Sequence, residues 1–281
     1  MASSLDLIQQ AILDLPESDA PHLDARWLLA ALLVVPHNDP SLRTDLEITE
    51  DQVSAFREQV RRRASGEPLA HILGEWEFYG RRFIVNPDVL IPRPDTELLV
   101  DWGIEILKGR QRPRVAEIGV GSLAVLASLA LEIPDLEGDG VDISAQALAV
   151  SRQNCRLHAL EDRLRLHLGH HFEPLSGRYD LLISNPPYIV PGDPELEDAV
   201  ERFEPEMALL DHLDGDGWGH HRARIDACGG YLSESGGLLL ECGRGQTEEI
   251  ERYALGKGWD SEVRADLSGI LRAVYVYQRG K

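Results

Sequence analysis

The stretch RVAEIGVGSLAVLASLALEIPDLEGDGVDI, residues 114–143, decides the fold class of this chain. It opens with a short apolar run that predicts a strand and passes through a glycine-rich turn, Gly119-Val120-Gly121-Ser122. An apolar segment that predicts a helix follows, and a second strand-like run occupies residues 138–143. Strand, turn, helix and strand in this order are typical of a parallel α/β sheet.

The same alternation continues toward the C-terminus. Ser144 can cap a helix that runs to about Leu157. Further strand-like runs lie at residues 164–168, 179–184, 237–241 and 273–277. We therefore predict an α/β fold with a doubly wound, mostly parallel sheet, and assign residues 98–281 to this domain.

The chain before residue 98 has a different pattern. Apolar residues at helical spacing over 5–15, 23–33 and 51–64 predict a small helical domain, which we place at residues 1–72. Residues 73–97 read as a hairpin and linker, with a turn at Gly80 and a stiff Ile91-Pro92-Arg93-Pro94 segment. The segment Asp95-Thr96-Glu97 is then expected to cap a helix that continues to about Lys108.

Composition narrows the function classes. The 281 residues carry 48 acidic and 28 basic side chains, a net charge of −20 that repels a phosphate backbone. No apolar run is long enough to span a bilayer, and the N-terminus does not resemble a signal peptide, so we expect a cytoplasmic protein. The three cysteines are scattered, and the pairs His170-His171 and His220-His221 suit surface or packing roles, so no metal site is predicted.

Ligands of open parallel sheets bind beyond the carboxyl ends of the strands. Glu117, Gly119 and Gly121 follow the first strand of the α/β domain, where glycine lets the backbone approach a ligand. Asp142 follows the next strand and suits hydrogen bonding to ribose hydroxyls. Each feature alone also fits a tight turn or a helix-start carboxylate. Together they favour an adenosine-type ligand.

The loop Asn185-Pro186-Pro187-Tyr188 follows a buried strand and carries the clearest chemical signal. Prolines have no N–H, so their carbonyl groups can face a pocket as acceptors, and the asparagine side chain adds another acceptor. Tyr188 can stack on a planar group. The loop therefore predicts a grip for a planar NH₂ group whose nitrogen is aimed at a methyl donor. A glutamine amide and an adenine both carry such a group.

The sequence around the loop resembles a known family, and this resemblance favours a glutamine amide over an adenine as the acceptor. The segments 66–74, 77–80 and 89–97, the tract 180–189, Glu204-Pro205 and residues 214–217 resemble the peptide-chain-release-factor N5-glutamine methyltransferases over nearly the whole chain. This resemblance implies a seven-stranded S-adenosylmethionine-dependent methyltransferase domain behind a helical domain that helps to recognise a release factor. The acceptor would be the glutamine of that factor's Gly-Gly-Gln motif. We expect a monomer, without a membrane or nucleic-acid partner.

The resemblance also implies roles for particular residues. The catalytic residues would be Asn185 and Tyr188, and the acceptor pocket would consist of Asn185, Pro186, Pro187 and Tyr188. The predicted cofactor-binding residues are Glu117, Gly119, Val120, Gly121, Leu123, Asp142, His171 and Asn185.

The sequence departs from the family pattern at four places. Glu117 stands where the cofactor loop usually begins with an aspartate, which is a mild change. Leu123 replaces the third glycine of the cofactor loop, His170 stands where an aspartate is usual, and Gly269-Ile270-Leu271-Arg272 replaces a more polar turn. Two alternatives follow. The shared Asn-Pro-Pro-Tyr loop allows an N6-adenine methyltransferase of DNA or RNA, and Leu123 allows a binding homologue with impaired cofactor affinity.

Overall fold

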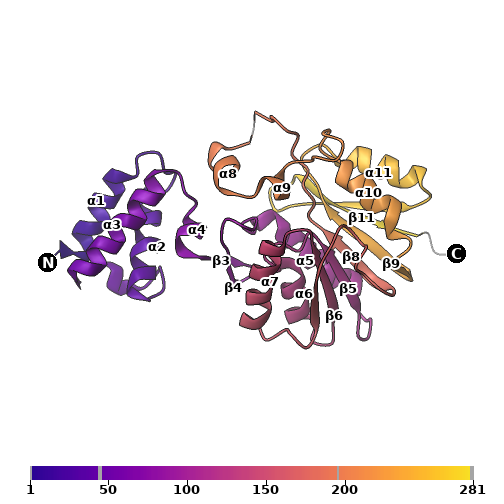
Figure 1. Ribbon diagram of the computed structural model, residues 1–281, viewed down its shortest axis with the longest axis horizontal. Coiled ribbons are helices and arrows are strands. Elements are labelled where there is room, and N and C mark those ends of the chain that lie inside the picture. The colour runs from indigo at the N-terminus through magenta and orange to yellow at the C-terminus, as the bar shows by residue number, and fades with distance from the viewer. Residues whose placement is uncertain (1, 44–45, 195, 279–281) are drawn as a thin grey trace. The chain divides into compact units, whose positions relative to one another are not determined.

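A computed structural model describes residues 2–43, 46–194 and 196–278 of the chain, so the outer ends of the predicted domains at residues 1 and 281 lie outside it. The chain divides into two compact units, Met1–Glu75 and Trp76–Lys281 (Figure 1). Among the described residues, no helix is long and apolar enough to cross a membrane.

The first unit is a small helical bundle with its own apolar core. Thr49 and Gln52 form a reciprocal capping box at the start of its third long helix, and Phe56 and Val60 of that helix are buried in the core. The predicted helical segments are therefore confirmed. The elements of this unit are β1 (Ala2–Ser3), α1 (Ser4–Asp14), α2 (Pro21–Leu33), η1 (Pro40–Arg43), β2 (Glu47–Ile48), α3 (Glu50–Ala64) and α4 (Leu69–Leu73).

A two-stranded hairpin of β3 (Glu75–Phe78) and β4 (Arg81–Ile84) comes next, as its sequence pattern predicted. The turn residues Tyr79 and Gly80 both have positive φ, 51° and 66°, which matches the twist of the two strands. Tyr79 tolerates this conformation because its N–H donates to Glu97 and its hydroxyl to Asp101.

The second unit contains a seven-stranded, mostly parallel sheet, which confirms the predicted fold class. The strand order is β10-β11-β9-β8-β5-β6-β7, and only the pairs that involve β11 are antiparallel. The chain order reverses between β5 and β8, which makes this the topological switch point. The strands are β5 (Arg114–Ile118), β6 (Glu137–Asp142), β7 (Leu164–Leu168), β8 (Tyr179–Ser184), β9 (Leu232–Glu241), β10 (Asp260–Ala265) and β11 (Leu271–Tyr277).

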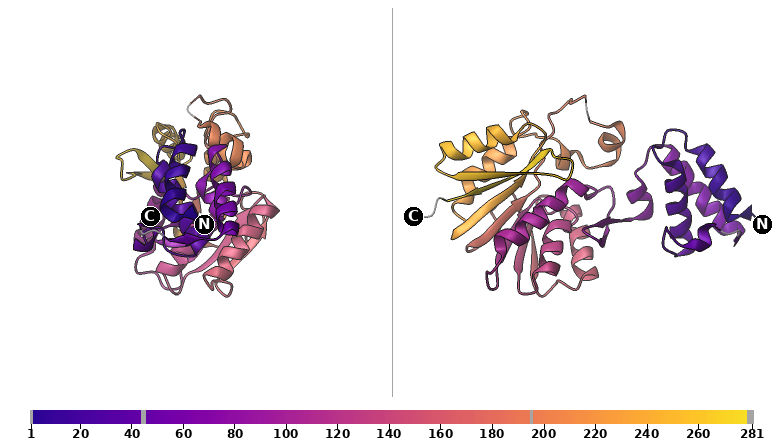
Figure 2. Two further views of the ribbon diagram at one scale, coloured as in Figure 1. Left: turned by 90° about the vertical axis from the view of Figure 1, so that its left-hand side faces the viewer. Right: turned by 180° about the vertical axis from the view of Figure 1, so that it is seen from behind.

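Helices cover both faces of this sheet (Figure 2, right). Alternate residues of each strand enter different cores, so Leu181 and Ile183 join one cluster with α5, α6 and α7, and Leu182 joins the other with α10 and α11. The remaining elements are η2 (Pro94–Thr96), α5 (Glu97–Leu107), α6 (Ala124–Glu132), α7 (Ala145–Leu157), α8 (Asp198–Phe203), α9 (Glu206–Leu209), α10 (Gly219–Cys228) and α11 (Thr247–Gly256).

Candidate functional site

A cavity of about 530 Å³ lies at the carboxyl edge of the parallel strands, beside the switch point. It brings together residues from the linker, from the glycine-rich turn Gly119-Val120-Gly121-Ser122 (the glycine loop) and from the end of β6. The segment after β7, the Asn-Pro-Pro-Tyr loop and α10 contribute the others. Among its lining residues are Arg93, Thr96, Glu117, Gly119, Val120, Gly121, Asp142, His170, His171, Asn185, Pro187, His220 and Arg224. Most of the predicted site residues therefore share one cavity.

The glycine loop presents bare backbone to this cavity. Gly119 and Gly121 have φ of 76° and 49°, and a Cβ atom on either would meet no protein atom within 4 Å. The N–H groups of Gly119 and Val120 both donate to the carbonyl of Val141, which ties the loop to β6. The open space beside these glycines is a cradle into which a ligand can approach the main chain.

Glu117, near the end of β5, connects the strand before the glycine loop to the helix after it. Its carboxyl accepts a 3.0 Å hydrogen bond from the N–H of Leu126 in the first turn of α6. That helix has no side-chain cap at Leu123, so Glu117 satisfies one of its free amide groups from the neighbouring strand. Burial, with a smaller contribution from the nearby Asp142, raises the pKa of Glu117 to about 8 despite this hydrogen bond.

Asp142 connects the loop to the following helix. One of its carboxyl oxygens accepts from the N–H of Gly121 and the other from the N–H of Ser144, each at 2.9 Å. Burial raises the pKa of Asp142, while these backbone hydrogen bonds oppose the rise. Each oxygen keeps one lone pair for a ligand, so Asp142 can still accept from two hydroxyl groups.

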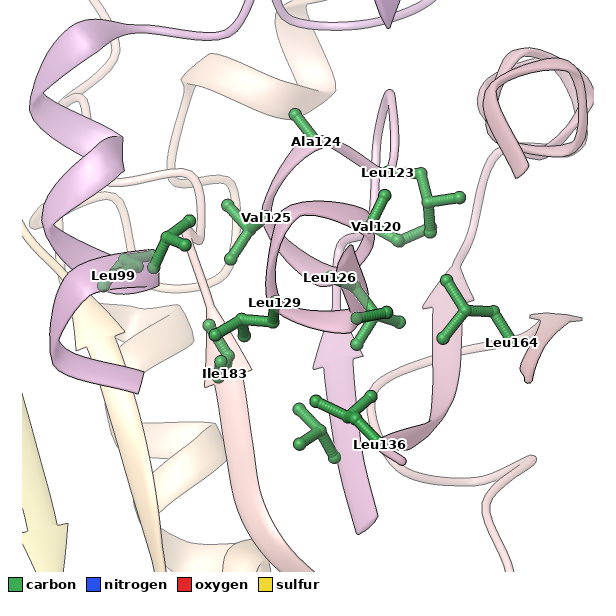
Figure 3. Close-up of a cluster of buried hydrophobic side chains, with 14 of the residues drawn as sticks. Leu99, Val120, Leu123, Ala124, Val125, Leu126, Leu129, Leu136, Leu164 and Ile183 are labelled. Atoms are coloured by element: carbon green, nitrogen blue, oxygen red, sulfur yellow. The ribbon is translucent and has the colours of Figure 1, made fainter. Parts of the chain in front are cut away.

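Leu123 has a different place from the one its position in the glycine loop suggested. Its side chain is fully buried in the cluster with Leu126 and Leu164 (Figure 3). It is not among the residues that line the cavity. Its backbone has a φ of 73°, the left-handed conformation that favours glycine. The Leu123 side chain therefore leaves the cradle open, and the departure from the family pattern is a matter of backbone strain and core packing.

Histidines and one arginine form another wall of the cavity. The rings of His171 and His220 are stacked at 6.0 Å, and burial lowers the pKa of each to about 4, so both are neutral at pH 7. Arg224 is almost fully buried and donates to the Ser184 hydroxyl and to the His220 carbonyl. Burial lowers its pKa to about 9, so it remains a cation at neutral pH.

His171 was predicted from the sequence, whereas His220 and Arg224 were missed. Both lie on α10, about 50 residues further along the chain, and no local motif marks them. Their pairing with His171 depends on the way α10 covers the sheet. His221, the next residue, has the packing role expected of it, because it is buried and its Nε2 contacts the carbonyl of Glu241 at 2.8 Å.

Two residues of the Asn-Pro-Pro-Tyr loop face the cavity, and Tyr188 fastens the loop to the rest of the domain. Asn185 and Pro187 line the cavity, but Pro186 and Tyr188 do not. The Tyr188 hydroxyl donates to Glu241 at 3.2 Å, and the Tyr188 carbonyl accepts from the Gln246 side chain at 3.1 Å. Tyr188 thus anchors the loop to the end of β9, and this geometry differs from the predicted stacking of its ring on an acceptor group.

Two other side chains have structural roles here. The Glu204 carboxyl accepts from the N–H of Ile91 and pairs with Arg93, so it fastens the proline-rich linker beside the cavity. Thr96 gives α5 no side-chain cap, contrary to the sequence prediction. Its hydroxyl instead accepts a 3.3 Å hydrogen bond from the Asn185 amide.

Comparisons with known proteins agree with this geometry. Residues 96–208 match the family described as methyltransferase small domain, and residues 6–74 match the PrmC N-terminal domain. A methyltransferase from Pyrococcus furiosus superposes with a TM-score of 0.53 at 15% identity, over 72% of this chain and 90% of that one. Fold and cavity together define a methyltransferase of the seven-stranded class.

Curated relatives specify the family. The release factor glutamine methyltransferase of Bordetella pertussis is 40% identical, over 92% of this chain and 95% of its own. The protein of the same name from Bradyrhizobium diazoefficiens is 38% identical, over 90% and 86%. The chain belongs to the family of release factor glutamine methyltransferases.

Proposed function

We propose that this protein transfers a methyl group from S-adenosylmethionine to the side-chain amide nitrogen of a glutamine in a peptide chain release factor. The observation that carries the proposal is that Asn185 and Pro187 share one cavity with the glycine cradle and Asp142. An acceptor amide held by Asn185 and Pro187 would therefore lie next to a cofactor held by the glycine cradle and Asp142. The names and close similarity of the relatives supply the identity of the acceptor.

The cavity fits the cofactor in size and chemistry. Its volume of about 530 Å³ lies within the range of small-molecule sites. The bare backbone of Gly119 and Gly121 accommodates a ligand chain, and the two free lone pairs of Asp142 suit the two hydroxyls of a ribose. His171 offers an aromatic face to a base. When bound, the cofactor supplies an activated methyl group on a positively charged sulfur.

The protein's own part is to position the acceptor nitrogen. The Asn185 amide nitrogen donates to Thr96, which leaves the Asn185 carbonyl oxygen to accept a hydrogen bond from the substrate NH₂ group. Orientation of this kind supplies much of the rate in a transfer between two bound groups. The methylated amide becomes more acidic and loses its proton to water, so no dedicated base is needed.

Incubation with labelled S-adenosylmethionine and a bacterial release factor tests the proposal. Label should enter the wild-type factor and be absent from a variant in which alanine replaces the glutamine of the Gly-Gly-Gln motif. Equal labelling of the two factors would contradict it. DNA and RNA serve as parallel acceptors, because adenine presents the same planar NH₂ group to the loop, and the net charge of −20 opposes their binding. We further propose that the protein acts as a cytoplasmic monomer.

A further inference from the structure

The two loops that border the cavity leave the sheet from neighbouring strands and then diverge. The backbone pairing of β5 with β8 ends at Glu117 and Ile183. Beyond this pair the glycine loop turns toward β6, because two of its N–H groups donate to the carbonyl of Val141. The other strand, β8, keeps its pairing with β9 for one more residue, Ser184. The sheet therefore opens between β5 and β8, as is expected at a topological switch point.

A side-chain hydrogen bond joins the two strands at the start of this opening. The hydroxyl of Ser184 donates to the carbonyl of Ile118 at 2.6 Å, one residue beyond the last backbone pair. Ser184 is fully buried and is not among the residues that line the cavity. Ile118 directly precedes Gly119, and Ser184 directly precedes Asn185. This bond therefore connects the start of the glycine loop to the start of the Asn-Pro-Pro-Tyr loop.

Arg224 determines the direction of that bond. Its Nε donates to the Ser184 oxygen at 2.9 Å, so the serine hydrogen is left to point at the carbonyl of Ile118. Nη1 of Arg224 donates to the carbonyl of His220 at 3.0 Å, one turn earlier in α10. The rigid, planar guanidinium thus holds the hydroxyl in one orientation. We call the connected groups of Arg224, Ser184 and Ile118 the Ser184 bridge.

The buried charge of Arg224 is costly to the fold. Only about 4% of Arg224 is exposed, and burial lowers its pKa to about 9, while the charge of Asp211 acts in the opposite direction. Asp211 is itself fully buried and accepts hydrogen bonds from the N–H groups of Gly217 and Gly219. Apolar residues of similar size often replace buried charges without loss of stability. Stability alone therefore does not explain an arginine at this place.

We propose that Arg224 and Ser184 are positioning residues, which fix the spacing between the glycine loop and the Asn-Pro-Pro-Tyr loop and so place the acceptor amide relative to the cofactor. This inference rests on the proposed function. The transfer is sensitive to such spacing, because a misplacement of about 1 Å can lower a rate by about a hundredfold. Arg224 also lines the cavity, whereas Ser184 does not, so a change at Ser184 tests the bridge without removing a cavity wall.

The first experiment measures kcat for methylation of a release factor in Ser184→Ala, in Arg224→Met and in the double variant. Each single variant should lower kcat at least tenfold, and Ser184→Ala should change the affinity for S-adenosylmethionine less than threefold. Because the two side chains act through one hydrogen bond, the double variant should be within about twofold of the slower single variant. Wild-type kcat in Ser184→Ala, or a double variant in which the two losses multiply, would overturn the proposal.

Ser233→Ala is the matched control. The Ser233 hydroxyl also links two neighbouring strands, since it donates from β9 to Asp180 of β8 at 3.1 Å. This link lies near the start of both strands, at the sheet edge opposite the cavity. Ser233→Ala should therefore keep kcat within about twofold of wild type. A loss equal to that of Ser184→Ala would contradict a specific role for the Ser184 bridge.

Amide hydrogen exchange provides a measurement that does not require turnover. The N–H groups of Gly119 and Val120 should exchange at least threefold faster in Ser184→Ala and in Arg224→Met, because the loop that carries them loses its connection to β8. Ser233→Ala should leave both rates unchanged. If the wild-type protein does not methylate the release factor but these amides respond as stated, the proposed function fails and the bridge stands. Wild-type exchange rates in Ser184→Ala and Arg224→Met would refute the bridge.

Discussion

At the scale of single residues, Leu123 is the position where sequence pattern and structure diverge most. A leucine with a φ of 73° pays about 1–2 kcal/mol of backbone strain that glycine would avoid. Its fully buried side chain offsets this cost, because removal of a buried leucine costs about 2–5 kcal/mol. Core packing therefore keeps a leucine where the ligand-binding loop alone would favour glycine.

Leu123→Gly should lower the free energy of unfolding by about 1–3 kcal/mol, since the lost packing exceeds the relieved strain. The affinity for S-adenosylmethionine should stay within about threefold of wild type, because the side chain lies outside the cavity. Urea denaturation and calorimetry measure the two quantities. Leu126→Ala, a helical neighbour in the same cluster, is the control without strain relief. A large gain in affinity in Leu123→Gly would mean that the leucine does obstruct the cofactor.

Gly119→Ala tests the cradle itself. Its new Cβ would point into open cavity space at a φ of 76°, so we expect at least a tenfold loss of S-adenosylmethionine affinity. Gly258→Ala is matched to it, since Gly258 has a φ of 85° and equally open surroundings but does not line the cavity. Both variants should lose about 1 kcal/mol of stability. Calorimetry that shows equal affinity losses in the two would argue against the cradle.

At the scale of elements, Asn154 of α7 joins the hairpin to the glycine loop. Its side chain exchanges hydrogen bonds with the N–H and carbonyl of Ile84 on β4 and donates to the carbonyl of Ser122. Asn154 is fully buried, so water cannot replace these bonds. The hairpin thereby braces the loop that borders the cavity.

Asn154→Ala should lower the free energy of unfolding by about 2–4 kcal/mol, because it leaves one buried and two partly buried backbone groups without the partner they have in the wild type. It should also weaken cofactor binding, since the Ser122 carbonyl loses its anchor. Asn86→Ala is the comparison, because the Asn86 side chain forms exposed hydrogen bonds with the nearby Asp88. Urea denaturation distinguishes them, and similar losses in both variants would contradict the bracing role.

At the scale of the whole molecule, buried carboxyl groups should make stability depend on pH. The raised pKa of Glu117, about 8, means that the folded state holds a proton that the unfolded state has released above about pH 4.5. Stability from this group therefore falls as pH rises toward 8. His171, His220 and His221, whose pKa values are lowered to about 4, act in the opposite direction, but only below about pH 6.5.

The free energy of unfolding should accordingly decrease between pH 6.5 and pH 8, where the histidines are neutral in both states. Glu117→Gln keeps an acceptor for Leu126 and removes the titration, so its decrease should be clearly smaller. Urea denaturation at the two pH values gives both differences. An equal decrease in wild type and variant would assign the effect to other groups, such as the general excess of negative charge.

Much of the fold could be predicted because it depends on local patterns. The apolar runs of β5, β6 and β8 and the glycine turn after β5 mark a buried parallel sheet in the sequence itself. β10 had no such signal. Its residues are mostly polar and only partly buried because it lies at the edge and pairs with β11 alone.

The sequence by itself therefore determined the alternation of strands and helices, the family, and the glycine and Asn-Pro-Pro-Tyr loops of the cavity, because each is encoded by neighbouring residues. Only the tertiary structure decided that Leu123 enters the core, that Tyr188 binds Glu241 instead of facing the cavity, and that Arg224 lines the cavity. These outcomes depend on contacts between residues tens of positions apart. Such contacts exist only once the sheet has brought the carboxyl ends of its strands together.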